Sequence, residues 1–239
     1  MTIKVYVYKT ISRLQMKIAA LFSGGKDSVY AISIAQQYGW DITHLVSILP
    51  KIPDSWMYHS VNIHLTKLLS EALNIPLISK ETTGEKEKEL ADLEELLQPL
   101  DIDGVISGAI ASEYQRTRIE RISHTLHIKS FTPLWHKDQT QLLKDQVHAG
   151  FHIIIVGAYA DGFTEQWLGR RIDDKAINEL EQLQKDRSIN TAGEGGEFET
   201  LVIDGPLFHK RIRIEDATIK WHRDNGSYLI QKARLVEKD

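Results

Sequence analysis

The chain contains no cysteine among its 239 residues. Disulfide bonds, cysteine-ligated zinc and iron–sulfur clusters are therefore excluded, because each of them requires cysteine sulfur. A persulfide carried by a cysteine of this chain is excluded for the same reason. The absence of thiols thus weakens any hypothesis of sulfur transfer.

A surplus of basic residues and a long apolar run are also missing. The net charge is −4, which argues against a protein built mainly to bind nucleic acid. No apolar run approaches the ~20 residues that span a bilayer, and residues 1–15 lack the apolar core of a signal peptide. With 42% hydrophobic and 26% charged residues, the composition is that of a globular protein. We therefore expect a cytoplasmic protein with neither a membrane partner nor a nucleic-acid partner.

Apolar strands alternate with amphipathic helices through the first half of the chain. We expect strands at 17–22, 41–49, 75–78, 103–107 and 128–132, and helices at 28–38, 58–73, 84–97 and 113–126. This alternation is typical of parallel βαβ units. It predicts an α/β fold with a doubly wound parallel sheet, in which ligands bind at the carboxyl ends of the strands.

The pattern changes at about residue 139. We expect helices at 142–149 and 173–185, the second capped by Asp173 or Asp174, an apolar strand at 151–158, and mostly strand after residue 200. A hairpin at 220–236 is expected to turn at Asp224-Asn225-Gly226, because Asn-Gly favours the type I′ turn. The sequence thus predicts an N-terminal extension at 1–15, a first domain at 16–135 and a second, smaller α+β domain at 136–239.

The hexapeptide Ser23-Gly24-Gly25-Lys26-Asp27-Ser28 separates the first expected strand from the first helix. Unpaired N–H groups and the positive end of the helix dipole make such a position an anion site. The two glycines allow a tight curl, and Lys26, expected to be exposed, adds a positive charge. The spacing is not that of Walker A. A glycine turn capped by Asp27 or Ser28 is the alternative, but the context favours a phosphate-binding loop.

Small residues at 107–109 follow the fourth expected strand and would let a planar ligand such as adenine approach the backbone. In the helix that follows, Arg116 or Arg118 could contact phosphate. Alternatively, these arginines belong to a solvated helix face, paired with Glu113 and Glu120.

The run at 193–200 combines glycines with three carboxylates. It could hold Mg²⁺, orient ammonia or meet a cationic substrate; a plain surface loop is the alternative. Tyr58 and His59 lie at the start of the helix expected after the second strand. They are candidates for the site, and the alternative is that they are ordinary surface polar groups. His124 and His127 share a helix face without a third ligand, so we expect them at the surface or at an interface.

The hexapeptide resembles the pyrophosphate-binding loop of the N-type ATP pyrophosphatases, which cleave ATP between its α and β phosphates. With further stretches in the same order, the chain resembles the diphthine–ammonia ligase family in its single-chain archaeal-like form. These stretches are Met57-Tyr58-His59, 83–89, 107–118, Pro133-Leu134-Trp135, Leu168-Gly169-Arg170 and 193–200. The resemblance covers nearly everything from Met16 to about Phe208, and 193–200 is its most specific mark.

This resemblance implies ATP-dependent amidation of diphthine on translation elongation factor 2 to diphthamide. Ammonium would be the nitrogen donor, and the reaction would pass through an acyl-adenylate, releasing AMP and pyrophosphate. The implied cofactors are ATP and Mg²⁺, and the implied fold is of the HUP/adenine nucleotide alpha hydrolase-like type. Residues 16–135 would be the ATP-binding domain and 136–239 the substrate-binding domain; a homodimer is compatible with the sequence. The alternatives are a tRNA-modifying ATP pyrophosphatase and a non-catalytic nucleotide-binding module.

The residues that match the motifs supply the expected site. The catalytic residues would be Lys26, Asp27 and Glu197, with Asp27 also the Mg²⁺ ligand. ATP and pyrophosphate would be bound by Ser23, Gly24, Gly25, Lys26, Asp27, Ser28, Ser107, Gly108 and Ala109. The substrate would be bound by Tyr58, His59, Tyr114, Gln115, Arg118, Glu194, Glu197 and Glu199. For the trimethylammonium group of diphthine, the suitable groups are Tyr58, Tyr114, Trp135 and Glu197, since aromatic faces and carboxylates attract cations.

Overall fold

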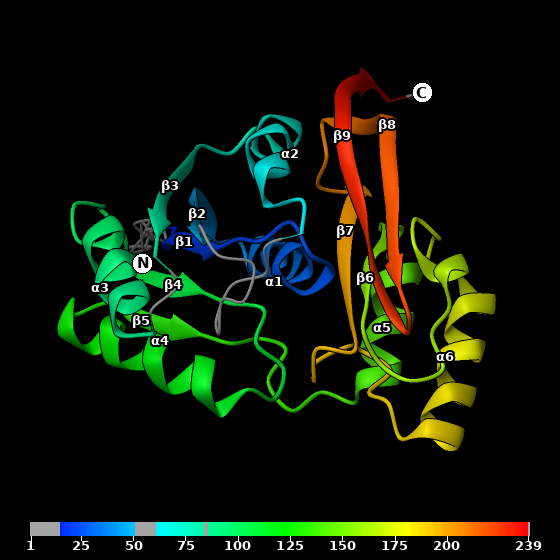
Figure 1. The fold of residues 1–239 in the computed structure, drawn as a ribbon. Helices are drawn as coiled ribbons and strands as arrows, with labels where there is room; N and C mark the ends of the chain where they lie inside the picture. Colours follow the sequence, from blue (N-terminus) through cyan, green and yellow to red (C-terminus); the bar gives the residue numbers. More distant parts are fainter. Residues whose placement is uncertain (1–14, 51–60, 84–85, 239) are drawn as a thin grey trace, which may run out of the picture.

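A computed structural model describes residues 15–50, 61–83 and 86–238 of the chain (Figure 1). Its first sheet has five parallel strands in the order β3-β2-β1-β4-β5. The strands are β1 (Lys17–Leu21), β2 (Asp41–Pro50), β3 (Leu77–Thr82), β4 (Gly104–Ile106) and β5 (Lys129–Phe131). The predicted parallel α/β sheet is confirmed.

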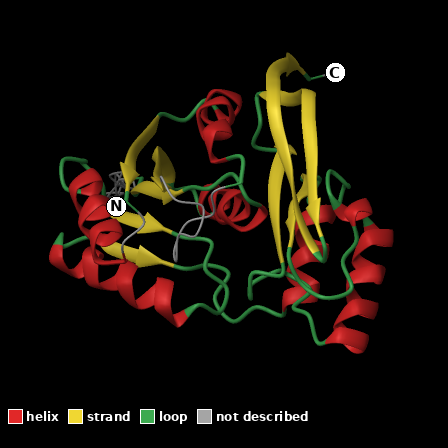
Figure 2. Cartoon of the chain, viewed as in Figure 1, coloured by secondary structure: helices red, strands yellow, loops and turns green. Residues whose placement is uncertain are grey.

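Helices cover both faces of this sheet (Figure 2). One face carries α1 (Lys26–Gln37), the short 3-10 turn η1 (Ile63–Leu65) and α2 (Thr66–Leu73), and the other carries α3 (Lys86–Leu97) and α4 (Glu113–Thr125). The central strand β1 is buried on both sides, since Ile18 and Ala20 pack with α1 and α2 whereas Ala19 packs with α3 and α4. A strand covered on both faces needs a continuous apolar run, as 18–22 provides.

The strand order reverses between β1 and β4. β1 pairs with β2 on one side and with β4 on the other. The chain therefore leaves these two neighbouring strands toward opposite faces, which opens a crevice at their carboxyl ends. The loop that follows β1 and the loop that follows β4 lie at this switch point.

The second sheet is antiparallel, with strand order β7-β6-β9-β8. It consists of β6 (His152–Ala158), β7 (Phe198–Asp204), β8 (Lys210–His222) and β9 (Asn225–Glu237), with α5 (Gln139–His148), the short 3-10 turn η2 (Glu165–Trp167) and α6 (Asp174–Arg187) beside it. This is the predicted smaller α+β unit. Asp173 caps α6, as its Oδ1 accepts a hydrogen bond from Ala176 N at 2.8 Å.

The helix expected at 58–73 is shorter than predicted. Residues 58–60 lie outside the described residues, and Asn62 adopts a left-handed conformation with φ 60° before the 3-10 turn. Its side chain bonds to β9, where Nδ2 donates to Tyr228 O at 2.8 Å and Oδ1 accepts from Ile230 N at 2.9 Å. Asn62 therefore acts as a tertiary link to the second sheet instead of a helix residue.

The hairpin of β8 and β9 turns earlier than the Asn-Gly pair predicts. His222 pairs with Asn225, so the turn consists of Arg223 and Asp224, with φ 57° at Arg223. Gly226 lies in the ladder instead, where an added Cβ would stand 2.5 Å from Lys220 O. The glycine thus serves close strand packing rather than the turn, and the hairpin is longer than the expected 220–236.

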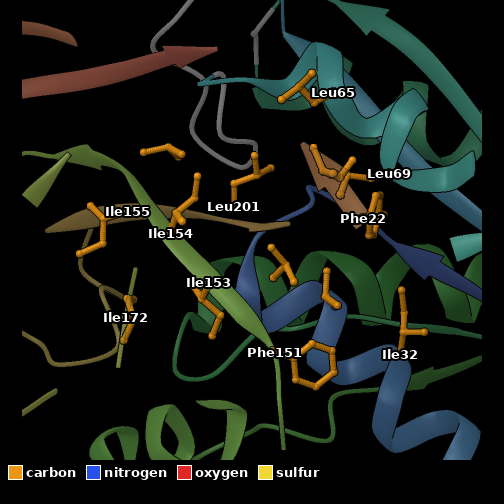
Figure 3. Close-up of a cluster of buried hydrophobic side chains, with 14 of the residues drawn as sticks. Phe22, Ile32, Leu65, Leu69, Phe151, Ile153, Ile154, Ile155, Ile172 and Leu201 are labelled. Atoms are coloured by element: carbon orange, nitrogen blue, oxygen red, sulfur yellow. The ribbon is translucent and has the colours of Figure 1, made fainter. Parts of the chain in front are cut away.

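One buried apolar cluster joins the two sheets (Figure 3). From the first unit, α1 and α2 contribute residues such as Ile32 and Leu69, and β6 and β7 contribute Ile155 and Leu201 from the second. The ring of Phe151 meets Tyr30 edge to face, with 5.8 Å between ring centres. The continuous core predicts that the two units unfold together.

Phe151→Ala should lower the free energy of unfolding by about 3–5 kcal/mol, because it empties a site that is only 2% exposed in this shared cluster. Urea unfolding, followed by circular dichroism and by tryptophan fluorescence, checks this value. The matched control is Ile219→Ala, at a side chain 40% exposed, which should change little. Two separate transitions, of which only one shifts in Phe151→Ala, would contradict a shared core.

Candidate functional site

A crevice of about 380 Å³ opens at the carboxyl ends of β1 and β4. Its walls come from three stretches, the loop at 21–28 with the start of α1, the loop and helix at 107–119, and the run at 192–200 that leads into β7. All the residues predicted to bind nucleotide line it except Gly24; they are Ser23, Gly25, Lys26, Asp27, Ser28, Ser107, Gly108 and Ala109. The structure thus brings two distant motifs of the first unit together with the glycine and glutamate run of the second.

The loop at 23–28 ends inside the first turn of α1, which begins at Lys26 and not at the expected residue 28. Gly25 occupies the N-cap position and has no side chain to cap the helix. The loop is closed by serines, since Ser28 Oγ donates to Gly25 O at 3.0 Å and Ser23 Oγ accepts from Gly25 N at 3.3 Å. The positive end of the helix dipole therefore faces the crevice with no side-chain cap from Gly25, as an anion site requires.

Lys26 is 4% exposed, so the expectation of an exposed loop lysine is wrong. Its ammonium lies 2.6 Å from Asp27 Oδ2. The other carboxylate oxygen of Asp27 accepts a hydrogen bond at 2.9 Å from Gln146 Nε2, on α5 of the second unit. Because both oxygens are engaged, the Asp27 carboxylate is held in one orientation at the crevice wall.

Gly108 brings the β4 loop against α1. An added Cβ would stand 2.5 Å from the carbonyl carbon of Asp27 and 2.7 Å from Ser28 N. No side chain fits there without separating the two loops. Next to it, the hydroxyl of Ser107 is buried without a hydrogen-bond partner in the described part of the chain. A polar ligand in the crevice could supply that partner.

Glu194 links the two units at one end of the crevice. Its Oε1 accepts hydrogen bonds from Ala111 N at 2.9 Å and from Ser112 N at 3.1 Å, at the N-terminus of α4. A carboxylate is stabilised there by the helix dipole. This contact accounts for the charge of Glu194 without a substrate, although the residue also lines the crevice.

Glu197 is not among the crevice residues, although we predicted it as catalytic. Its Oε1 accepts from Asn190 N at 2.9 Å and its Oε2 accepts from Gly195 N at 2.8 Å. The side chain therefore stabilises its own loop and borders a second, polar pocket with Lys137 and Gln139. Glu197 lies in the bend before β7 begins at Phe198, and its side chain turns back onto its own loop.

Glu199 lies within β7 and lines the crevice. Its neighbour Thr200 accepts a hydrogen bond at its Oγ1 from Lys26 N, at 3.2 Å. Burial, followed by the charge of Glu199, raises the pKa of Tyr159 to about 12. The Tyr159 phenol is therefore neutral at physiological pH and lies close to the Glu199 carboxylate.

The other residues predicted to bind substrate divide into three groups. Tyr58 and His59 lie outside the described residues. Gln115 lines the crevice. Tyr114 and Arg118 are not among the crevice residues, and they stack on each other with 3.4 Å between the guanidinium carbon and the ring centre.

Arg116 follows the predicted alternative in which an arginine of α4 is paired with carboxylates on the same helix. It contacts Glu113 at 2.8 Å and also Glu120. Its guanidinium also covers the ring of Trp135 at 5.0 Å. Trp135 in turn stacks on His136.

Two residues of the site were not predicted, Gln146 and Thr200. Gln146 belongs to no motif and reaches the loop only through the packing of α5, whereas Thr200 ends the run at 193–200 and was not singled out as a site residue. Among residues 15–50, 61–83 and 86–238, no group of three or more histidines or carboxylates gathers to hold a metal ion. None of the described helices is long and apolar enough to cross a bilayer.

Comparison with known proteins gives consistent matches along the chain. Residues 16–130 match the diphthamide synthase N-terminal domain, and residues 138–236 match the diphthamide synthase C-terminal domain. A Bos taurus protein named diphthine–ammonia ligase is 31% identical over 93% of this chain and 91% of its own length. A Schizosaccharomyces pombe protein of the same name is 34% identical over 94% of this chain, which spans only 40% of that relative.

Among solved structures, a predicted subunit of tRNA methyltransferase from Methanocaldococcus jannaschii is similar, with a TM-score of 0.45. The identity is 18%, and the match covers 80% of this chain and 98% of that one.

Glu197→Gln should lower the free energy of unfolding by about 1–2 kcal/mol, because an amide nitrogen cannot accept the hydrogen bond that one of the two carboxylate oxygens accepts from the loop backbone. Chemical denaturation measures the difference. Glu165→Gln is the control, since Glu165 is an exposed carboxylate in which the same change should have little effect. A Glu197→Gln protein as stable as the control would argue against this loop-stabilising role.

Proposed function

The chain belongs to the diphthamide synthase family, and from this membership and the crevice geometry we propose that it is a diphthine–ammonia ligase. The observation that carries the proposal is the meeting of a pyrophosphate-type loop with the run at 192–200 in one crevice. A nucleotide would lie against the first unit while the second unit presents a wall to the carboxyl group that is to be activated.

The chemistry requires ATP because a carboxylate does not react with ammonia directly. One carboxylate oxygen attacks the α-phosphorus of ATP, the bond to pyrophosphate breaks, and an acyl-adenylate forms. Ammonia then attacks the acyl carbon, AMP leaves with its oxygen, and a proton is lost from the new amide nitrogen. Catalysis is mainly positioning and stabilisation of the leaving groups.

The loop residues fit the departure of pyrophosphate. The N-terminus of α1 and Lys26, which both line the crevice, would stabilise the negative charge that develops on it. The Lys26 ammonium is held by Asp27 Oδ2 at 2.6 Å. Gly108 and the buried hydroxyl of Ser107 shape the adjoining wall, against which the adenosine part of the nucleotide would lie.

Asp27 is a suitable ligand for Mg²⁺. This ion is usually held by one or two carboxylates together with substrate phosphates and water, and Asp27 supplies one oriented carboxylate at the crevice wall. When bound, Mg²⁺ neutralises phosphate charge. Gln146 would keep the Asp27 carboxylate in place by donating to its Oδ1.

The protein substrate would be translation elongation factor 2 carrying diphthine. Free ammonium is the expected nitrogen donor, because the chain has no cysteine with which to run a glutaminase. The cytoplasmic location expected from the sequence stays a prediction, and a homodimer stays compatible with the sequence. A nucleotide sensor would need only the first unit, whereas here Glu199 and Thr200 of the second unit line the same crevice.

The products should be AMP and pyrophosphate. Incubation with ATP, Mg²⁺, ammonium and diphthine-bearing elongation factor 2 should convert the carboxylate to the amide, as seen by mass spectrometry of the factor. Nucleotides are separated by ion-exchange chromatography in the same samples. Reactions without ammonium or without the factor are the controls. Release of ADP and phosphate in the complete reaction would contradict the proposed cleavage of ATP.

Lys26→Met should reduce turnover by about 10²–10³, as expected when one charged donor to a developing anion is removed. It should also lower the free energy of unfolding by about 1–3 kcal/mol, because the Asp27 carboxylate loses its partner. Rates are therefore measured well below the melting temperature. Lys67→Met, at an exposed lysine of α2, is the control. Normal turnover in Lys26→Met would indicate that the loop has only a structural role.

A further inference from the structure

Three neighbouring strands of the second sheet place Glu199, Gly157 and Ser227 in one row. Gly157 of β6 is paired with Glu199 of β7 on one side and with Ser227 of β9 on the other. Directly paired residues in a sheet present their side chains to the same face. The row therefore runs from the crevice residue Glu199 to Ser227, with a gap in the middle where glycine has no side chain.

The ring of Tyr159 fills this gap. An added Cβ on Gly157 would stand 2.4 Å from the Tyr159 hydroxyl oxygen and 2.8 Å from Cε2. The hydroxyl lies 3.5 Å from Ser227 Oγ. Gly157 thus leaves room for the aromatic ring to lie on the sheet between the serine and the glutamate. A side chain at position 157 would occupy that room.

Tyr159 is a large aromatic side chain that stays 38% exposed in this position. The Glu199 carboxylate lies close enough to raise its pKa through charge and hydrogen bonding, after burial as the larger cause. A neutral aromatic ring next to a carboxylate attracts cations, and it suits cations without N–H groups in particular. Lys26 and the ion-paired Arg116 of α4 are not in this row.

The row borders the pyrophosphate loop. Thr200 follows Glu199 directly and accepts a hydrogen bond from Lys26 N at 3.2 Å. A cation held at Tyr159 and Glu199 would therefore stand beside the place where the carboxyl group is activated. Diphthine needs this arrangement, because its trimethylammonium nitrogen and its reacting carboxyl group are attached to the same carbon.

We propose that the Tyr159 ring and the Glu199 carboxylate hold the trimethylammonium group of the substrate. This proposal rests on the proposed function and names the residues that recognise the substrate cation. Tyr159 was not among the sequence candidates. Of those candidates, Tyr114 and Trp135 are covered by arginine side chains, and Glu197 accepts hydrogen bonds from the backbone of its own loop.

The test compares Tyr159→Leu, Tyr159→Phe and Glu199→Gln in the amidation assay. Tyr159→Leu removes the ring and should raise KM for the protein substrate about 10-fold, with KM for ATP unchanged. Glu199→Gln should also raise KM for the protein substrate. Tyr159→Phe keeps the ring and should stay near the wild type. Tyr38→Leu, at a side chain 69% exposed at the C-cap of α1, is the matched control for the loss of a surface tyrosine.

Tetramethylammonium chloride serves as a probe of the cation site, with sodium chloride as the ionic-strength control. It should compete with the protein substrate and not with ATP, and Tyr159→Leu should weaken the inhibition about 10-fold. If Tyr159→Leu leaves both the protein KM and this inhibition unchanged, the site is overturned. A rise in KM for ammonium instead of the protein would overturn it as well, by assigning the pair to the nitrogen donor.

Binding of tetramethylammonium, followed by saturation-transfer NMR, needs no turnover and separates the two proposals. A wild-type protein that does not amidate diphthine, but binds the probe through Tyr159, would reject the proposed function and retain the cation site. A wild-type protein that amidates diphthine, but binds no probe and tolerates Tyr159→Leu, would retain the function and reject the site. Equal impairment of Tyr159→Phe and Tyr159→Leu would also reject it, since the ring would then not be the binding element.

Discussion

The site depends on the contact between β7 and the loop that follows β1. Gly24 O accepts a hydrogen bond from Val202 N at 3.0 Å, and Lys26 N donates to Thr200 Oγ1 at 3.2 Å. A second sheet is thereby hydrogen-bonded to the phosphate-binding loop of the first. Gly24 allows this loop conformation, because its φ of 79° is one that residues with a side chain rarely adopt. Without this contact, the crevice would lose its second wall.

The shared core explains why such a contact can be maintained. The apolar faces of α1 and α2 pack on the first sheet and also on β6 and β7, so the two units bury one cluster between them. A large apolar interface makes relative motion of domains costly. The shared core therefore fixes the relative position of the two units. The hydrogen bond from Gln146 to Asp27 forms between these fixed units.

Charge in the crevice is arranged in pairs. The Lys26 ammonium is balanced by Asp27, and Glu194 is balanced by the N-terminus of α4. Buried or half-buried charges are stable only when they are compensated in this way. The Glu199 carboxylate lies close to the neutral phenol of Tyr159. A carboxylate beside an aromatic ring suits a cationic substrate group, whereas the loop at Lys26 suits phosphate.

The sequence by itself determined the layout of the first sheet, the phosphate-type loop and the change to a second α+β unit, because periodicity and glycine placement are local properties of the chain. It did not determine which carboxylates of the run at 193–200 reach the crevice, since this depends on where the bend ends and β7 begins, and on how β7 packs against the loop that follows β1. Tertiary structure placed Glu197 on its own loop and Glu199 in the crevice. It also brought in Gln146 and Tyr159, whose positions depend on how α5 and β6 pack, and no local pattern in the chain encodes that packing.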